Sequence, residues 1–242
     1  MEKKKETIDM KQIEKMFEVG AHYAYTKTKR HPSTKSFIFG NKNGTELFDL
    51  EKTSQSLEDA KNFIKETLAG ANKQVLFVGS KSEVKDTVKE TADKLEMPSV
   101  TNRWVGGTLT NFDEIKKRAE KYQKLIDERE KGDLSKYTKK ERGKIDKEIL
   151  KLERKFSGIV SMKTLPAILF VVDSKYESIA VEEARQKNIP VVALVNSDCD
   201  IKKIDYPILA NDSVCESVKF FVEEVASVFK TGVVKTGTET KK

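Results

Sequence analysis

The sequence predicts an α/β protein, in which a parallel sheet with helices on both faces carries an inserted antiparallel helical (coiled-coil) hairpin. Runs of β-branched and large apolar residues indicate three buried parallel strands, at 73–80, 166–173 and 189–196. Segments with helical spacing of apolar residues lie between and after them, at 83–96, 176–188 and 213–230. Strands that alternate with helices in this way are typical of a parallel sheet covered on both faces.

The segment before the first predicted strand has a pattern of its own. Residues 36–49 hold two short apolar pieces joined by Asn43 and Gly44, a turn signal that predicts a β-hairpin or two short edge strands. Helical spacing follows over 51–70, and Gly70 marks the end of this helix.

The segment 111–156 differs from the rest because it has no proline, no strand-like run and a narrower apolar stripe. Its apolar residues repeat at heptad spacing in two series, Ile115, Ala119, Tyr122 and Ile126, then Ile145, Ile149, Leu152 and Phe156. Such stripes suit two helices that mainly bury each other, and Gly132 with a Thr138 helix cap predicts a turn between them. We therefore expect a hairpin that packs on itself, so that replacing 112–156 by a linker leaves the remaining body folded.

These elements predict a discontinuous α/β domain over 9–110 and 157–230, interrupted by the helical hairpin at 111–156. The polar ends, 1–8 and 231–242, are predicted to be disordered.

Composition narrows the classes of function. The 242 residues carry a formal net charge of +7, which favours a polyanionic partner such as nucleic acid or an acidic membrane surface, with a basic enzyme as the alternative. Two cysteines suit a reducing interior, and no apolar run reaches the roughly 18 residues of a membrane helix. The charged first residues also lack a signal-peptide pattern. We therefore expect a cytoplasmic protein without a membrane partner.

The sequence is poorly equipped for catalysis. His22 and His31 are its only histidines, and neither lies in a pattern typical of nucleophilic catalysis or zinc binding. Asp173 and Asn196 end predicted strands, where α/β folds place their sites, but such residues also cap the next helix. The turn at 78–83 lacks both GxGxxG and GxxxxGK[ST]. We predict no catalytic residue, cofactor, metal or small-molecule substrate; a sugar-phosphate or nucleotide-binding α/β enzyme is the alternative.

Basic residues form the more prominent feature. One cluster lies in a loop near the N-terminus, and the hairpin carries the other: Lys27, Lys29, Arg30, His31 and Lys35, then Lys116, Lys117, Arg118, Lys121, Lys139, Lys140 and Arg142. Such cations can contact RNA phosphates. The alternative is a solvated helical face, because interspersed acidic residues can pair with them at i,i+4.

The stretch RWVGGTLTNF, at 103–112, closely resembles the signature of the bacterial family of small-subunit ribosomal protein two. The resemblance extends over about residues 16 to 230, through VLFVGSK, GIVSMKTLPAILFVVD, IPVVALVNSDCD and IDYPILANDS in the family's order. Tyr25 and Arg30 stand where the family usually has histidine and tryptophan, so no local role that needs imidazole or indole is implied there.

The resemblance implies a flavodoxin-like sheet with an inserted helical hairpin, and a structural role in the small ribosomal subunit. It implies binding of the subunit's RNA at the junction of head and body. It also implies contact with neighbouring small-subunit proteins, including the largest one, which recruits messenger RNA.

Within RWVGGTLTNF we predict a joint between body and hairpin. Trp104 anchors the bend in apolar surface, and Gly106 and Gly107 permit close approach or a positive φ. Thr110 or Asn111 is expected to cap the first long helix. Arg103 is predicted to reach an RNA phosphate.

Overall fold

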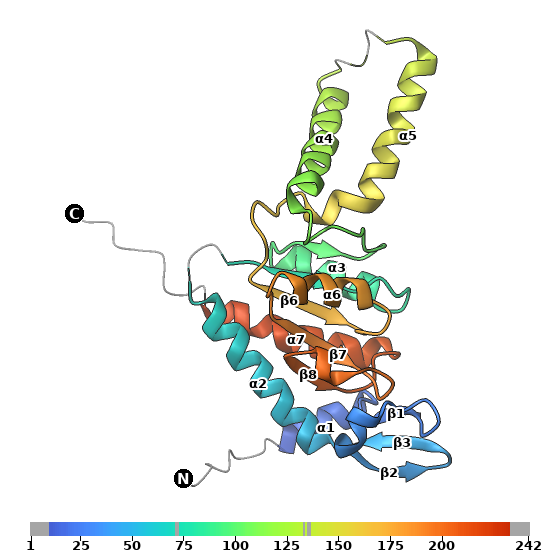
Figure 1. Cartoon of the computed structure of the whole chain (residues 1–242), viewed down its shortest axis with the longest axis vertical. Helices are drawn as coiled ribbons and strands as arrows, with labels where there is room; N and C mark the ends of the chain where they lie inside the picture. The colour runs from blue at the N-terminus through green and yellow to red at the C-terminus, as the bar shows by residue number, and fades with distance from the viewer. Residues whose placement is uncertain (1–9, 71–72, 133, 135–136, 233–242) are drawn as a thin grey trace, which may run out of the picture.

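A five-stranded parallel sheet forms the centre of the molecule (Figure 1). The computed structural model describes residues 10–70, 73–132, 134 and 137–232. The strands are β4 (Val75–Val78), β5 (Ser99–Val100), β6 (Ile168–Val172), β7 (Val191–Val195) and β8 (Tyr206–Leu209). Their spatial order is β5-β4-β6-β7-β8, and each neighbouring pair is parallel. Counted along the chain this order is 2-1-3-4-5, which is that of flavodoxin-like sheets.

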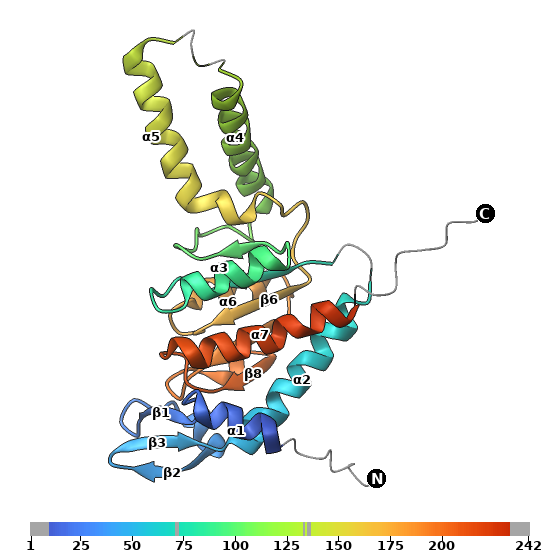
Figure 2. The same ribbon diagram turned by 180° about the vertical axis from the view of Figure 1, so that it is seen from behind.

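Helices cover both faces of the sheet because successive strand residues point to opposite sides. Leu169 and Val171 of β6 pack in one apolar cluster with α6 (Ser178–Gln186), while Ile168 and Phe170 pack in the other. That second cluster contains α1 (Met10–Glu18), α2 (Leu50–Leu68), α3 (Lys85–Lys94) and α7 (Cys215–Gly232). Figures 1 and 2 show α6 on one side, and α3 and α7 on the other.

The strands that the sequence predicts are those buried on both faces. Every residue of β4, β6 and β7 is buried, which explains their continuous apolar runs. The predicted strands did not include β5, which has two residues, or β8, an edge strand that contains Pro207.

The predicted C-terminal tail begins too early. Helix α7 continues through 231 and 232, because Val225 and Phe229 hold its last turns in the core. The other residues predicted to be disordered, 1–8 and 233–242, lie outside the described residues.

A small antiparallel sheet of order β1-β3-β2 lies at the β8 end of the body (Figure 1). Its strands are β1 (Tyr23–Thr26), β2 (Ile38–Lys42) and β3 (Thr45–Phe48). Asn43 and Gly44 join β2 to β3 with φ of 54° and 84°, and two successive positive φ values are what the two-residue type I′ hairpin turn requires.

Helices α4 (Phe112–Glu130) and α5 (Lys139–Phe156) lie side by side and project beyond the β5 edge (Figures 1 and 2). All eight residues of the heptad stripes are shielded: Ile115, Ala119, Tyr122, Ile149 and Phe156 are buried, and Ile126, Ile145 and Leu152 are half-buried. Thr138 caps α5 as predicted, in a reciprocal capping box with Glu141.

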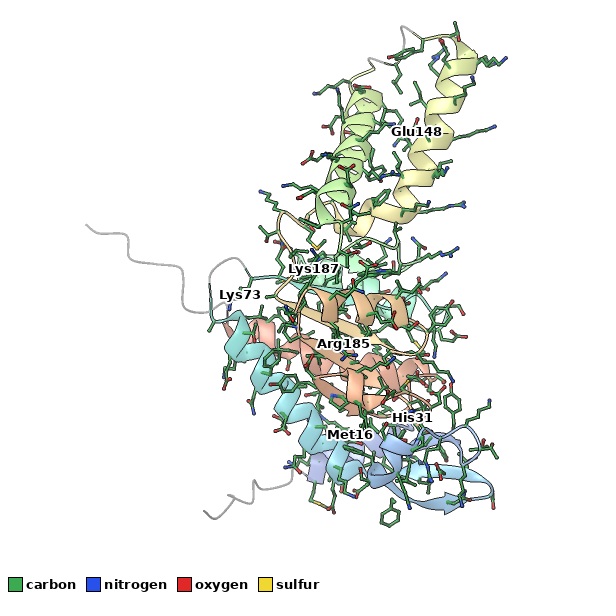
Figure 3. All side chains as sticks on the ribbon, in the orientation of Figure 1. Met16, His31, Lys73, Glu148, Arg185 and Lys187 are labelled. Atoms are coloured by element: carbon green, nitrogen blue, oxygen red, sulfur yellow. The ribbon has the colours of Figure 1, made fainter. Side chains whose placement is uncertain are left out.

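An ion pair crosses between the two helices. Lys121 Nζ of α4 donates to Glu148 Oε1 of α5 at 2.5 Å, and Glu148 lies between the helices in Figure 3. The side chains of Lys121 and Glu148 are about half exposed, so this pair stabilises the contact only modestly.

The base of the helical pair belongs to the core of the body. Ile115, Ala119 and Phe156 pack in the same cluster as Trp104 and the strand residues Leu76 and Val78. A replacement of 112–156 would therefore remove part of the body's core, and the tolerated replacement must begin farther out, at Tyr122, which is not in that cluster.

We expect that replacing 122–147 by a short glycine–serine linker leaves the body folded, because the Lys121–Glu148 pair shows that the two cut ends are close. Replacing 112–156 instead should lower the free energy of unfolding by more than about 4 kcal/mol, the combined effect of losing a buried Ile and a buried Phe. Urea unfolding followed by circular dichroism compares the two proteins. Equal stability of both would show that the base of the pair is not part of the core.

Candidate nucleic-acid interface

The loop that leads from β5 into α4 is organised by one buried carboxylate, that of Glu183 in α6. Glu183 Oε1 accepts hydrogen bonds from Trp104 Nε1 at 3.0 Å and from the Gly107 N–H at 2.8 Å. Glu183 Oε2 accepts from the N–H groups of Leu109 and Thr110 at 3.0 and 3.2 Å, and from Thr110 Oγ1 at 3.2 Å. The predicted joint is thus closed by a residue more than 70 positions further along the chain.

These hydrogen bonds change the acidity of Glu183. Burial alone would raise the pKa of its carboxyl group, but the donors from Trp104, Gly107, Leu109 and Thr110 outweigh burial and lower the pKa below its ordinary value. The carboxylate is therefore the form that the folded loop holds at neutral pH.

The members of the predicted joint have different roles. Trp104 is 7% exposed, so it packs as predicted, with its indole N–H satisfied by Glu183. Gly107 has a φ of 92°, which favours glycine, whereas at Gly106 an added Cβ would meet no atom within 4 Å and φ is not positive.

The predicted side-chain cap of α4 was wrong. Asn111 occupies the N-cap position, but its side chain makes no capping hydrogen bond. The hydroxyl of Thr110 is committed to Glu183 instead. The hydroxyl of Thr110 bonds to the Glu183 carboxylate and not to the end of α4, because a hydrogen bond to a charged acceptor is the stronger one.

The N-terminal basic cluster divides into internal and exposed cations. Arg30 Nη1 pairs with Glu46 Oε1 at 2.6 Å, and the Glu46 side chain is only 4% exposed. Removing Arg30 would leave that carboxylate buried without a counterion, so Arg30 has a structural role; its contact with RNA stays a prediction.

His31 also has a structural role. It is the N-cap of the 3-10 helix η1 (Pro32–Phe37), with Nδ1 accepting from the Ser33 N–H at 3.3 Å. Asp200 Oδ1 lies 3.8 Å from the same nitrogen. Lys27, Lys29 and Lys35 are exposed, and Lys29 Nζ lies 5.4 Å from the centre of the Tyr25 ring.

The cations of the helical pair also differ in their surroundings. Lys117 pairs with Glu114 at 2.6 Å and Lys121 with Glu148, while Lys116 Nζ lies 3.5 Å from the carbonyl of Lys163. Arg103, Arg118, Lys139, Lys140 and Arg142 are exposed, and within the described part of the chain none of them forms an ion pair. The exposed cations are the ones available to phosphates.

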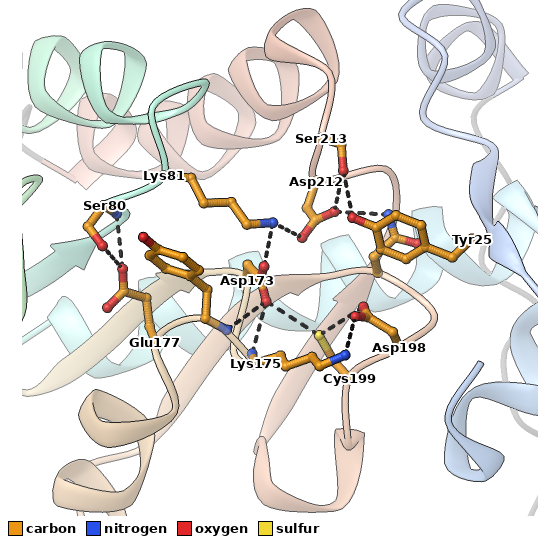
Figure 4. A network of polar contacts seen from close by, with 12 residues as sticks. Tyr25, Ser80, Lys81, Asp173, Lys175, Glu177, Asp198, Cys199, Asp212 and Ser213 are labelled. Carbon is orange, nitrogen blue, oxygen red and sulfur yellow. Dashed lines mark hydrogen bonds and ion pairs between the residues drawn. The ribbon is translucent and has the colours of Figure 1, made fainter. Parts of the chain in front are cut away.

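The carboxyl ends of the central strands hold a network of polar side chains (Figure 4). Lys81, which follows β4, pairs with Asp173 after β6 and, at 3.1 Å, with Asp212 after β8. Asn196 Nδ2 donates to Asp212 Oδ1 at 2.9 Å. Asp173 has a φ of 65°, and its Oδ1 accepts from the N–H groups of Lys175 and Tyr176 in the turn before α6. Asp173 is not the cap of that helix, because Glu177 holds the N-cap position without a side-chain capping bond.

This network fills the position where doubly wound sheets bind their ligands. Ligands of such folds lie outside the carboxyl ends of the strands where the strand order reverses, here between β4 and β6. Burial would lower the pKa of Lys81, but the carboxylates of Asp212 and Asp173 outweigh it and raise that pKa. A fixed internal ammonium group therefore occupies the crevice between the two aspartates.

The neighbouring thiol of Cys199 is unsuited to nucleophilic chemistry. Burial raises the pKa of the Cys199 thiol to about 12, so the reactive thiolate is scarce at neutral pH.

Across the described residues, no three His, Cys, Asp or Glu side chains form a group that could hold a metal ion. Nor does any described helix combine the length and apolar character of a membrane span.

Glu183, Glu46, Lys81 and Asp212 were missed by sequence reasoning. Only Glu183 left a signal: it lies three residues after Ala180 and next to Ala184, so it falls on the buried stripe of α6. The partners of the other three come from distant parts of the chain, which no local pattern reveals.

The fold and these surfaces define a doubly wound α/β protein that fills its own ligand crevice and has exposed cations on a loop and a helical arm. The family model of Ribosomal protein S2 matches residues 16–232. The chain is 38% identical over 220 residues to Small ribosomal subunit protein uS2 of Coprothermobacter proteolyticus, covering 91% of this chain and 82% of that protein. It is 41% identical to the proteins of the same name from Desulforapulum autotrophicum, over 88% of this chain and 76% of that one, and from Roseiflexus sp., over 87% and 80%. The chain belongs to the ribosomal protein S2 family, which confirms the resemblance found in the sequence.

We expect Glu183→Gln to lower the free energy of unfolding by about 2 kcal/mol at pH 7, because several hydrogen bonds lose a charged acceptor. Glu182→Gln is the matched control, since Glu182 is the exposed neighbour on the same helix. Urea unfolding measures both. Equal effects of the two substitutions would show that the buried carboxylate does not hold the loop.

The difference between the wild type and Glu183→Gln should depend on pH. The pKa of Glu183 is lower in the folded than in the unfolded protein, so the carboxylate stabilises the fold above the unfolded pKa of about 4.3. That stabilisation is lost as the pH falls through the folded pKa. Unfolding free energies measured from pH 7 to pH 3 should therefore converge at the acidic end; a constant difference would contradict the assignment.

Proposed function

We propose that this chain is a structural constituent of the small ribosomal subunit, bound in the cytoplasm to the subunit's RNA and to neighbouring small-subunit proteins. The largest of these, which recruits messenger RNA, is among the proposed partners. Membership of the S2 family carries this proposal, supported by relatives that bear the name of a small-subunit protein and match most of this chain.

Sedimentation of a cell lysate tests the role directly. The chain should migrate with small subunits on a sucrose gradient at physiological magnesium, and move to lighter fractions when the subunit RNA is digested. A chain that stays in the light fractions throughout would overturn the proposal.

The proposal assigns no catalytic activity, cofactor or small-molecule substrate to the chain. The Lys81 network supports this part, because Asp173 and Asp212 already pair with the Lys81 ammonium group and would repel an added phosphate. No observation favours the alternative of a nucleotide-binding enzyme.

The segment 111–156 is proposed to act as an antiparallel coiled-coil arm that contacts RNA. The shielding of its heptad residues supports the coiled coil. Three exposed cations at the start of α5, Lys139, Lys140 and Arg142, support RNA contact, because none is paired with a described carboxylate. Arg103, Arg118, Lys27, Lys29 and Lys35 are the further proposed contacts; Lys116, Lys117 and Lys121 rank lower because each has an internal partner.

We expect that neutralising Lys139, Lys140 and Arg142 together to alanine weakens binding to small-subunit RNA about tenfold at 0.1 M salt, and reduces the slope of log affinity against log salt by about 2 to 3. Filter binding over a salt series measures both quantities. Thermal stability should change little, because exposed charges contribute little to folding.

The matched control neutralises Lys85, Lys89 and Lys94 of α3, which removes the same charge from exposed positions of the body. If both triple variants lose the same affinity, net charge and not the arm determines binding, and the N-terminal loop with Lys27 and Lys35 becomes the main candidate.

A further inference from the structure

A groove lies between helix α2 and the edge strand β8. Figure 1 shows β8 at the far side of the sheet from the helical arm. Its volume is about 470 Å³, and α2 lines one wall with residues spaced three or four apart, from Ser56 to Glu66. The start of β8 lines the other wall, with Asp205, Tyr206 and Pro207. The groove is therefore a concave surface built on a helix and a strand of the rigid core.

The lining of this groove includes aromatic rings. The rings of Phe63 and Tyr206 stack with centroids 4.1 Å apart and an interplanar angle of 18°, and both side chains remain half-buried. Phe37 adds a third aromatic ring at the rim. The parts of these rings that remain accessible offer planar or cationic groups a binding surface.

The charge of the groove is opposite to that of the chain. Its lining includes three carboxylates, Asp59, Glu66 and Asp205, and no lysine, arginine or histidine, although the chain carries a net charge of +7. Asp205 Oδ2 accepts from the Val191 N–H at 2.8 Å, but none of the three carboxylates forms an ion pair with a residue in the described ranges. Glu58, the neighbour of Asp59 on α2, is by contrast paired with Lys61.

The backbone of the edge strand β8 is poorly suited to pairing with an added strand. Pro207 lacks an N–H, and the carbonyl of Leu209 already accepts from Thr53 Oγ1 at 2.6 Å. A partner must therefore be recognised through its side chains. Carboxylates beside exposed ring faces select guanidinium and ammonium groups, arginine above all, because its planar group can both stack and pair.

We propose that this groove docks an arginine-rich segment of a neighbouring protein. RNA does not suit it, since the unpaired carboxylates repel phosphates. The inference adds a protein-docking surface to the function proposed above; the free cations of the arm face RNA, and the α2–β8 groove receives cations from a protein.

The test uses the full chain and a fluorescent peptide of alternating glycine and arginine, with a glycine–glutamine peptide of equal length as probe control. Anisotropy should show salt-sensitive binding of the arginine peptide only. The double variant Asp59→Asn with Glu66→Gln should bind it about fivefold more weakly at 0.1 M salt, through the loss of two exposed ion pairs. Tyr206→Leu, which keeps all carboxylates, should weaken binding about threefold through the loss of a ring face.

The control variant Asp86→Asn with Glu90→Gln makes the same charge change on exposed positions of α3 and should bind within twofold of the wild type. Equal peptide affinity of the groove and control variants overturns the proposal. So does an RNA decamer whose affinity falls in the groove variant alone, which would place RNA there. A dimer in sedimentation equilibrium that the groove variant abolishes would assign the groove to a second copy. A chain that fails to migrate with small subunits leaves these results unaffected, so the two proposals fail separately.

Discussion

The carboxylate of Glu183 sets the path of the chain from the α/β body into the helical arm. Its two oxygens accept the N–H groups of Gly107, Leu109 and Thr110 and the indole of Trp104, at distances of 2.8 to 3.2 Å. Without that acceptor, these donors would lack a partner inside the protein, and Trp104 would lose the contact that orients its ring. Helix α4 begins directly after this loop, so its direction depends on Glu183 together with the apolar base formed by Ile115 and Phe156.

Buried polar groups that pair with one another also fill the site where folds of this class bind ligands. A doubly wound sheet provides a crevice at the carboxyl ends of its strands, and many α/β proteins use it for ligands. Here Lys81, Asp173 and Asp212 occupy the crevice with compensating charges, and the strands beneath are buried on both faces. The surfaces proposed to bind partners lie around this centre: the helical arm beyond the β5 edge, and the basic loop and the acidic aromatic groove toward the β8 edge.

The net charge of the chain does not show which cationic side chains are free to contact a partner. Arg30 and Lys139 look equivalent in a basic sequence, yet Arg30 neutralises the buried Glu46, whereas Lys139 stands exposed at the first turn of α5. The difference lies in desolvation: a buried carboxylate needs its counterion, and a solvated one does not. Burial of a carboxylate therefore decides whether its partner cation is held within the fold, as Arg30 is by Glu46.

Local patterns in the sequence determined the elements with strong periodicity. Strands β4, β6 and β7 could be predicted because both of their faces are buried, which gives continuous apolar runs. The Asn43–Gly44 turn could be predicted because two positive φ values restrict the residue types. The helical arm could be predicted because its apolar stripe is narrow. The blocks that carry the family resemblance were equally visible. Only the tertiary structure decided the roles of Glu183, Lys81 and Arg30, the place of Ile115 and Phe156 in the body's core, and the groove between α2 and β8. The physical reason is that a charged side chain acquires its role from the partner it meets and the water it loses, and those partners lie from 16 to 131 residues away along the chain.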